Sequence, residues 1–118
     1  MAESLRRGHR EPDETRKFDK GKVDIVNLSG GTVGRFLFEP GWKWSEDVKP
    51  IAGTGWCQAS HHAYQRTGRL HVVMSDGSEF EVGPGEVCII PPGHDAWVVG
   101  NEPVTGVDWA GMANYAKK

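Results

Sequence analysis

The chain has few cysteines and almost no net charge, and each shortage excludes a class of protein. Its 118 residues include two cysteines, Cys57 and Cys88. Two thiols are too few for the dense disulfide framework of small secreted domains, so we expect both to stay reduced. The formal net charge is -2. Without a basic surplus the chain lacks the field that attracts phosphates, so we expect neither a nucleic acid nor a membrane as its partner.

Long apolar runs are also missing from the sequence. No run approaches the roughly 18 apolar residues that a membrane-spanning helix needs. The start, MAESLRRGHREPDETRK, has no apolar centre of the kind found in signal peptides. We therefore expect a cytoplasmic protein. Its length is that of one domain, since independent domains typically have about 100 to 150 residues.

Turn-forming residues, by contrast, are abundant. The 16 glycines and 7 prolines argue against a helical bundle. The first 20 residues differ from the rest because they are mostly charged and offer little for a core to bury. Such a segment cannot offset the entropy lost on ordering, so residues 1–20 are predicted to form a mobile charged arm. Residues 21–118 are predicted to form one folded domain.

Short β-branched and aromatic runs fill this domain and alternate with turn signals. They include VDIVNL, TVGRFLF, RLHVVM, SEFEV, EVCIIP and AWVVG. Turn signals spaced about eight to twelve residues apart are typical of antiparallel sandwiches and barrels, and no run predicts a helix longer than one turn. Asp76-Gly77 predicts a two-residue hairpin turn with positive φ at both positions. The pattern therefore predicts an all-β barrel with an interior pocket.

One stretch in the second half of the chain has a more specific pattern. Gly85 is followed by Pro91 and Gly93 at the spacing of a Gly, five residues, Pro, one residue, Gly motif, and residues 91–97 read PPGHDAW. These features resemble the small single-domain cupins, in particular the subgroup that carries PPGHDAW, and the likeness covers residues 39–109. The resemblance implies a cupin-like double-stranded β-helix, also called a jelly-roll barrel.

The resemblance also implies a metal site, although the ligands differ from the usual cupin set of three histidines and a glutamate. When Tyr64 and Gly68 are matched to the family, Cys57 takes the place of a histidine and His61 that of the glutamate. His94 stands near the last cupin histidine. Cys57 and His61 are four residues apart, so an extended strand directs both to one face. The resemblance thus predicts Cys57, His61 and His94 as ligands of a divalent transition metal.

The predicted ligands, a thiolate and two imidazoles, favour zinc, with nickel or iron as alternatives. Three protein ligands leave a fourth position for water or a substrate atom. Two other interpretations stay open. His62 replaces His61 if a one-residue bulge shifts the strand. The three side chains could also be core groups without a metal, since free cysteine is among the most buried residue types.

Aromatic residues near the ends of the predicted strands are candidates for the pocket wall. Trp56, Tyr64 and Trp97 are predicted to contact a bound small molecule, with the Tyr64 phenol as a hydrogen-bond donor. Packing within the core is the alternative for these side chains. Asp95 faces away from its neighbour His94 on an extended strand, so we interpret it as an acid that caps a turn.

The resemblance implies several functions, because cupin barrels host dioxygenases, isomerases, decarboxylases and lyases as well as binding and sensor modules. We expect a metal-binding barrel that acts as an enzyme on a small organic acid or related metabolite. No residue stands out as a general base. The alternatives are a non-catalytic module that senses a small molecule, metal or redox state, and a metal-free barrel that binds an apolar ligand. The habit of the family and exposed strand edges also predict a homodimer.

Overall fold

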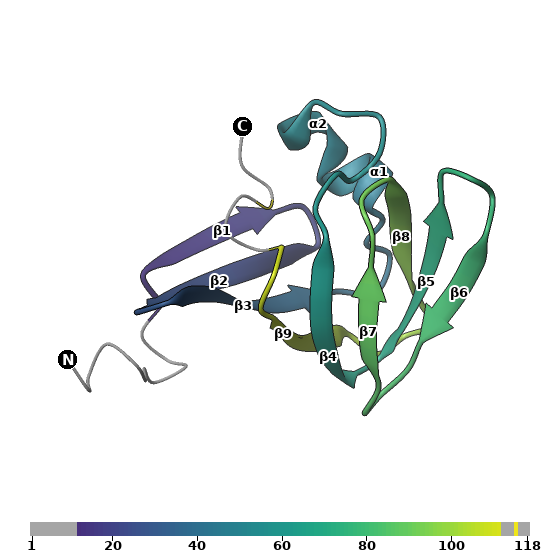
Figure 1. Ribbon diagram of the computed structural model, residues 1–118. Coiled ribbons are helices and arrows are strands. Elements are labelled where there is room, and N and C mark those ends of the chain that lie inside the picture. Colours follow the sequence, from purple (N-terminus) through teal and green to yellow (C-terminus); the bar gives the residue numbers. More distant parts are fainter. Residues whose placement is uncertain (1–11, 112–114, 116–118) are drawn as a thin grey trace.

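The computed structural model describes residues 12–111 and Tyr115, which form two antiparallel sheets and two short helices (Figure 1). The six-stranded sheet has the order β1-β2-β3-β9-β4-β7 and the three-stranded sheet the order β6-β5-β8. The strands are β1 (Glu14–Phe18), β2 (Gly21–Leu28), β3 (Gly31–Phe38), β4 (His61–Thr67), β5 (Arg69–Met74), β6 (Glu79–Val82), β7 (Val87–Ile90), β8 (His94–Val99) and β9 (Val104–Asp108). The predicted all-β architecture is confirmed.

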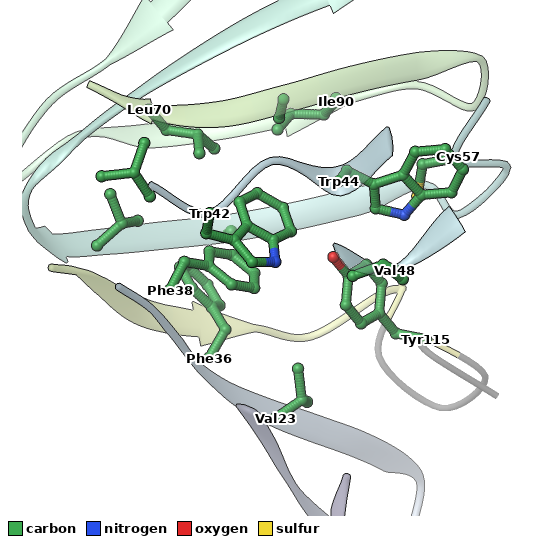
Figure 2. Close-up of a cluster of buried hydrophobic side chains, with 14 of the residues drawn as sticks. Val23, Phe36, Phe38, Trp42, Trp44, Val48, Cys57, Leu70, Ile90 and Tyr115 are labelled. Carbon is green, nitrogen blue, oxygen red and sulfur yellow. The ribbon is translucent and has the colours of Figure 1, made fainter. Parts of the chain in front are cut away.

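The two sheets enclose one hydrophobic core. Buried and less buried residues alternate along β8 and β9, so every second side chain points inward. The buried apolar side chains come from both sheets and from the segment after β3, and include Val23, Ile25, Phe36, Phe38, Trp42, Trp44, Val48, Leu70, Val72 and Val104 (Figure 2). Phe38 stacks between Phe36 and Trp42, with ring centroids 5.3 and 4.0 Å away. This aromatic stack lies inside the barrel.

Two helices of four residues each, α1 (Trp44–Asp47) and α2 (Lys49–Ala52), connect β3 to β4. Each is about one turn long, as the sequence predicts. The segment that leads into α1 is tied to β8, because the Val98 amide donates to the Trp42 carbonyl at 3.0 Å. None of the helices in the described part of the chain is long and apolar enough to cross a lipid bilayer.

The hairpin between β5 and β6 differs from the predicted two-residue turn. The Gly77 amide donates to the Met74 carbonyl at 2.9 Å, and the Met74 amide donates to the Ser78 carbonyl at 2.8 Å. Only Gly77 has a positive φ, of 92°, whereas Asp76 does not. The loop therefore has three residues, with the left-handed glycine last, and the Asp76 carboxylate accepts hydrogen bonds from Ser78 instead.

The charged segment expected to be a mobile arm is in part a strand. β1 pairs antiparallel with β2 along its whole length, and the Phe18 ring lies 6.1 Å from the Phe38 ring. Arg16 donates through Nη1 to the backbone carbonyl of Tyr115 at 2.7 Å. Backbone pairing and the contacts of the Phe18 ring with Phe38, Trp42 and Tyr115 supply the stabilisation that composition alone did not predict. Residues 1–11 of the expected arm lie outside the described residues.

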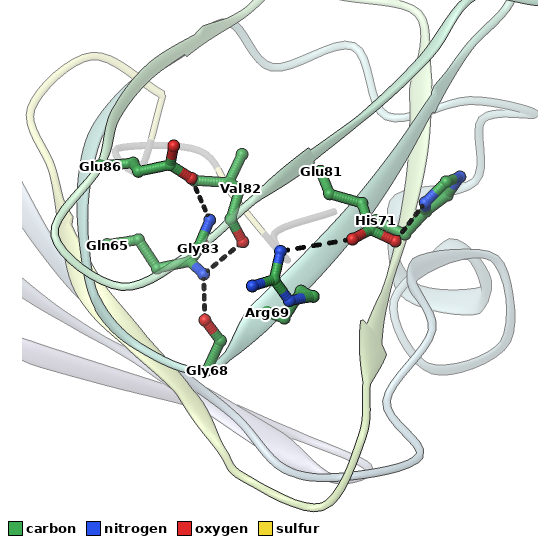
Figure 3. Close-up of polar contacts among 8 residues, drawn as sticks. All are labelled: Gln65, Gly68, Arg69, His71, Glu81, Val82, Gly83 and Glu86. Atoms are coloured by element: carbon green, nitrogen blue, oxygen red, sulfur yellow. Dashed lines mark hydrogen bonds and ion pairs between the residues drawn. The ribbon is translucent and has the colours of Figure 1, made fainter.

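A buried amide fixes the end of β4 that leads into β5. Gln65 is 2% exposed, and its Nε2 donates to the carbonyls of Gly68 and Val82, each at 2.8 Å (Figure 3). The Glu86 carboxylate accepts the Gly83 amide close by. These side-chain bonds satisfy carbonyl and amide groups in the turns of this end of the barrel. The bonds of Gln65 fix the C-terminal end of β4, and His61 lies at the N-terminal end of the same strand.

β7 is the edge of the six-stranded sheet and carries exposed apolar side chains. Val87 and Ile89 are 67% and 63% exposed, and β7 pairs within the described chain only with β4. Unpaired strand edges of this kind are where a second chain can add. The homodimer expected from the sequence stays a prediction.

His71 joins two carboxylates on the outer face of the small sheet. Its Nε2 lies 2.6 Å from Glu79 Oε1 and its Nδ1 lies 3.1 Å from Glu81 Oε2, and Figure 3 shows the second contact. The hydrogen bonds to Glu79 and Glu81 raise the pKa of the imidazole above 6.5, against a smaller opposing effect of burial. The protonated ring therefore links β5 to β6.

We predict that this link stabilises the fold in acid and is lost in alkali. A folded-state pKa raised above the unfolded one gives stability that is fully present below the unfolded value and disappears as the pH rises through the folded value. The free energy of unfolding of wild type and His71→Gln, measured by urea at about pH 5.5 and about pH 9, should differ more at the lower pH. An equal difference at both pH values would contradict the prediction.

Candidate metal centre

Three side chains that are separated in sequence meet where the two sheets come together. His61 begins β4 in the large sheet and His94 begins β8 in the small one. Cys57 lies in the loop before β4 and forms an isolated antiparallel bridge with His94. The Cys57 amide donates to the His94 carbonyl at 2.8 Å, and the Gly93 amide donates to the Cys57 carbonyl at 2.7 Å. This bridge holds the thiol beside β8.

The ligand atoms of these residues are close enough to share one ion. One donor atom from each of Cys57, His61 and His94 lies within 4.8 Å of the others, and Cys57 Sγ is 3.8 Å from His61 Nε2. Zinc bond lengths and a tetrahedral angle place a sulfur and a nitrogen ligand about 3.6 Å apart. All three residues are buried, with exposed fractions of 4%, 6% and 3%. The donor set and its spacing therefore fit a divalent metal.

Both imidazoles are held through Nδ1. His61 Nδ1 lies 2.5 Å from Asp108 Oδ2, and His94 Nδ1 lies 2.8 Å from the Pro91 carbonyl oxygen. A carboxylate or carbonyl oxygen at this distance accepts the Nδ1 proton, so in the neutral form of each ring the lone pair is on Nε2. Histidines that bind metals typically have their second nitrogen held in this way.

Asp108 is a residue of this site that the sequence analysis missed. It ends β9, is 1% exposed, and its Oδ1 accepts the amides of Ala110 at 2.9 Å and Gly111 at 3.1 Å. The available signal was its position in the alternation of β9, in which Val104, Gly106 and Asp108 all face inward. Asp95 instead accepts the Ser45 amide of α1 at 3.0 Å, so it bonds to a distant helix and not to the neighbouring turn that the sequence analysis expected.

The charges of the cluster depend on one another. Burial by itself raises the pKa of the Cys57 thiol, but hydrogen bonding to His61 and His94 and their positive charge lower it from 9.0 to about 6. Burial by itself lowers the pKa of His61, but Asp108 and Cys57 raise it to about 9. The Asp108 pKa is lowered, because the bonds and charge of its partners outweigh its burial. Near neutral pH the metal-free cluster therefore holds a thiolate, an imidazolium and a carboxylate.

The structure shows which of the neighbouring histidines, His61 or His62, lies beside Cys57 and His94. His61 faces the interior, whereas His62 is half-buried on the opposite face of β4 and pairs with Ile89. The register shift of β4 lies farther along the strand, at Gln65 and Thr67. The strand alternation therefore holds at its start, and His61 is the histidine that lies with Cys57 and His94.

A small cavity lies inside the barrel beside the two histidines. Its wall consists of Phe36, Phe38, Trp42, Trp44, His61, Ala63, Gln65, Leu70, Cys88, Ile90, His94, Ala96, Asp108 and Tyr115. The centres of water-sized spheres can occupy about 40 Å³ of it. A wider hollow, about 370 Å³ by the same measure, lies on the Cys57 side and includes Trp44 and Tyr115 in its wall. Cys57 thus lies in the wall of this hollow, whereas His61 and His94 lie in the wall of the inner cavity.

The three aromatic residues predicted to contact a ligand are not in the wall of this cavity. Tyr64 is 38% exposed because it alternates with the inward-facing Ala63 on β4. Trp97 lies on the outer face of β8, where it stacks on His71 at 4.8 Å. Trp56 is 38% exposed in the loop before Cys57. The prediction chose these residues because they are aromatic and lie near the ends of predicted strands, whereas strand alternation decides which side chains face the interior.

No family model matches this sequence, and no curated protein matches it at a significant level. Solved structures do match. A cupin-like protein from Thermotoga maritima has a TM-score of 0.57 at 16% identity, over 93% of this chain and 81% of that chain. A protein of unknown function from an Acinetobacter species has a TM-score of 0.59 at 10% identity, over 83% of this chain and 90% of that one.

A larger protein is similar as well. The oxalate decarboxylase of Lactobacillus farciminis, in complex with formate, has a TM-score of 0.59 at 13% identity, over 85% of this chain and 31% of that chain. The present chain therefore corresponds to about a third of the decarboxylase. Identities this low show the fold alone, which is a cupin-like all-β barrel as the sequence predicts.

We predict that the thiol of Cys57 ionises far below the usual range in metal-free protein. After treatment with a chelator, the ultraviolet absorbance of the thiolate should rise with a midpoint near pH 6. Cys57→Ser should remove this step, whereas burial raises the pKa of Cys88 and keeps it out of this range. His61→Gln should shift the midpoint upward, because it removes the positive neighbour. A wild-type midpoint near 9 would contradict the prediction.

Proposed function

We propose that Cys57, His61 and His94 bind one divalent transition metal, with zinc as the first candidate and nickel or iron as alternatives. The observation that carries this proposal is the orientation of the two imidazoles. Each has its Nδ1 proton bound to an oxygen atom, so that Nε2 is left for another partner. A thiolate and two Nε2 atoms form a donor set that suits these metals and does not suit magnesium or calcium.

The proposal extends to catalysis on a small organic acid or related metabolite. Cys57, His61 and His94 are the group of possible ligands found among residues 12–111 and Tyr115, and three ligands leave a position open. When bound there, a divalent metal polarises a carbonyl or carboxylate oxygen. Asp108 orients His61, and the largely apolar wall of the cavity limits the water around a bound molecule. We also propose that the chain belongs with the cupins that carry PPGHDAW.

A sensing module is the second candidate, and the presence of a thiol in the donor set favours it. A peroxide would oxidise the Cys57 thiolate to a sulfenic acid and be reduced to hydroxide, which would remove one of the three ligands and weaken the hold on the metal. Turnover separates the two candidates. An enzyme consumes a small organic acid when loaded with metal and stops when His94 is replaced by alanine, whereas a sensor binds without consuming. A metal-free barrel with an apolar ligand is the third candidate, and the aromatic cavity wall supports it.

The metal itself is tested by elemental analysis of protein purified without a histidine tag or chelator. We expect about one metal ion per chain in the wild type and a loss of it in Cys57→Ala and in His94→Ala. His62→Ala is the matched control, because His62 adjoins His61 but lies on the other face of β4. A wild type without metal, together with variants that fold normally, would overturn the proposal and favour the apolar ligand.

Asp108 is expected to control metal affinity through the tautomer of His61. In Asp108→Asn the amide oxygen keeps the bonds from Ala110 and Gly111, so the amide nitrogen turns toward His61 Nδ1. Nδ1 must then accept, and the proton moves to Nε2, where it blocks the metal. Competition with a chelator should show an affinity about 10- to 100-fold weaker. Asp95→Asn is the control, and an unchanged affinity in Asp108→Asn would contradict this role.

A further inference from the structure

The barrel cavity has an unused hydrogen-bond donor in its wall. Trp42 is 2% exposed, and among the described residues its indole Nε1–H is the buried side-chain polar atom that has no hydrogen-bond partner. The ring is held in place, because it stacks on Phe38 and because the Trp42 backbone bonds to Glu39 and to Val98. An indole nitrogen only donates, so the missing partner must be an acceptor atom.

The Trp42 side chain that carries this donor lies in the wall of the same cavity as the two candidate metal ligands. Trp42, His61 and His94 all contribute to its wall. Figure 2 shows the indole nitrogen of Trp42 and the hydroxyl of Tyr115 turned toward the same space. Buried polar groups are nearly always paired in folded proteins. A lone donor on a side chain that lines a cavity therefore points to an acceptor atom of a bound molecule as its missing partner.

The size and lining of the cavity restrict that molecule further. A space of about 40 Å³ for the centres of water-sized spheres is enough for about three waters, since one needs about 10 to 15 Å³ in this measure. Ala63, Leu70 and Ala96 line other parts of the wall and offer no side-chain polar atom. A short molecule with an acceptor at one end and an apolar body satisfies both kinds of surface.

We propose that the cavity binds a carbonyl compound of about four non-hydrogen atoms, the oxygen of which accepts a hydrogen bond from Trp42 Nε1. Short carboxylates and short neutral carbonyl compounds share this oxygen. The evidence for a ligand site is the cavity and the free donor of Trp42. The further claim that such compounds are the substrates rests on the function proposed above. It goes beyond that function by naming the donor that recognises the ligand and the size at which recognition stops.

The test follows the indole N–H signals of the full-length, zinc-treated protein by nuclear magnetic resonance. Trp42→Phe identifies the Trp42 signal. Acetate or acetamide should shift this signal saturably, whereas ethylammonium, which is of similar size but has no acceptor, should not. Trp42→Phe should weaken binding of the active compound at least about tenfold. Trp56→Phe is the matched control and should leave the affinity unchanged, because Trp56 is exposed and outside the cavity wall.

Two further measurements keep the outcomes distinct. Ala96→Leu fills the cavity while Trp42 remains, and it should abolish binding even if Trp42→Phe fails to fold. Zinc content is measured on the same samples. A Trp42 signal that moves with neither carbonyl compound, in protein that retains zinc, overturns this inference and leaves the metal proposal standing. A signal that shifts in protein without bound zinc supports the ligand site and overturns the metal proposal instead.

Discussion

The hydrogen bond between His61 and Asp108 is the interaction on which the chemistry of the barrel depends. Both side chains are buried, and Asp108 is fixed from the other side by two backbone amides. The carboxylate therefore cannot turn away, and it holds the Nδ1 proton of His61 in one place. The opposite nitrogen is then directed at Cys57. Without Asp108 the ring would have no fixed tautomer, and the thiol would have a less basic neighbour.

The position of the cluster between the sheets gives it a structural consequence as well. His61 belongs to β4 of the large sheet, whereas His94 belongs to β8 of the small sheet, and the Cys57 bridge joins the loop before β4 to the start of β8. An ion held by all three residues would cross-link the two sheets at one end of the barrel. Binding that occurs only in the folded state stabilises it by mass action. If the proposed metal is bound, the topology would thus couple metal binding to folding.

The sequence predicts those features that follow from local periodicity. Short alternating runs and frequent turn signals predict the all-β barrel. Cys57 and His61 do meet, but not along one extended strand as expected, because Cys57 lies in the loop before β4 and is held by its bridge to His94. Asp108 could not be found from local periodicity, because its contact with His61 spans 47 residues and depends on the pairing of β4 with β9. The predicted two-residue turn at Asp76 was also wrong, because the contacts of the Asp76 side chain were not considered. Hydrogen bonds from Ser78 satisfy its side chain without a positive φ.

The residues expected in the pocket wall show that nearness in sequence to the cluster does not place a side chain in the cavity. Trp56, Tyr64 and Trp97 are aromatic and close in sequence to the cluster, yet alternation or loop position turns them away from the cavity. Trp42 is farther from the cluster in sequence than these three residues, but its backbone bond to Val98 brings it to the barrel interior.

The identity of the Trp42 side chain itself carries an argument about function. The stack with Phe38 requires only an aromatic ring, and a phenylalanine would provide one without burying a free N–H. A buried donor without a partner opposes folding, because it gives up its hydrogen bond to water. An oxygen in the cavity removes that cost, so Trp42 is matched to its surroundings when the cavity is filled. The choice of tryptophan at position 42 is therefore an argument for the acceptor proposed in the cavity.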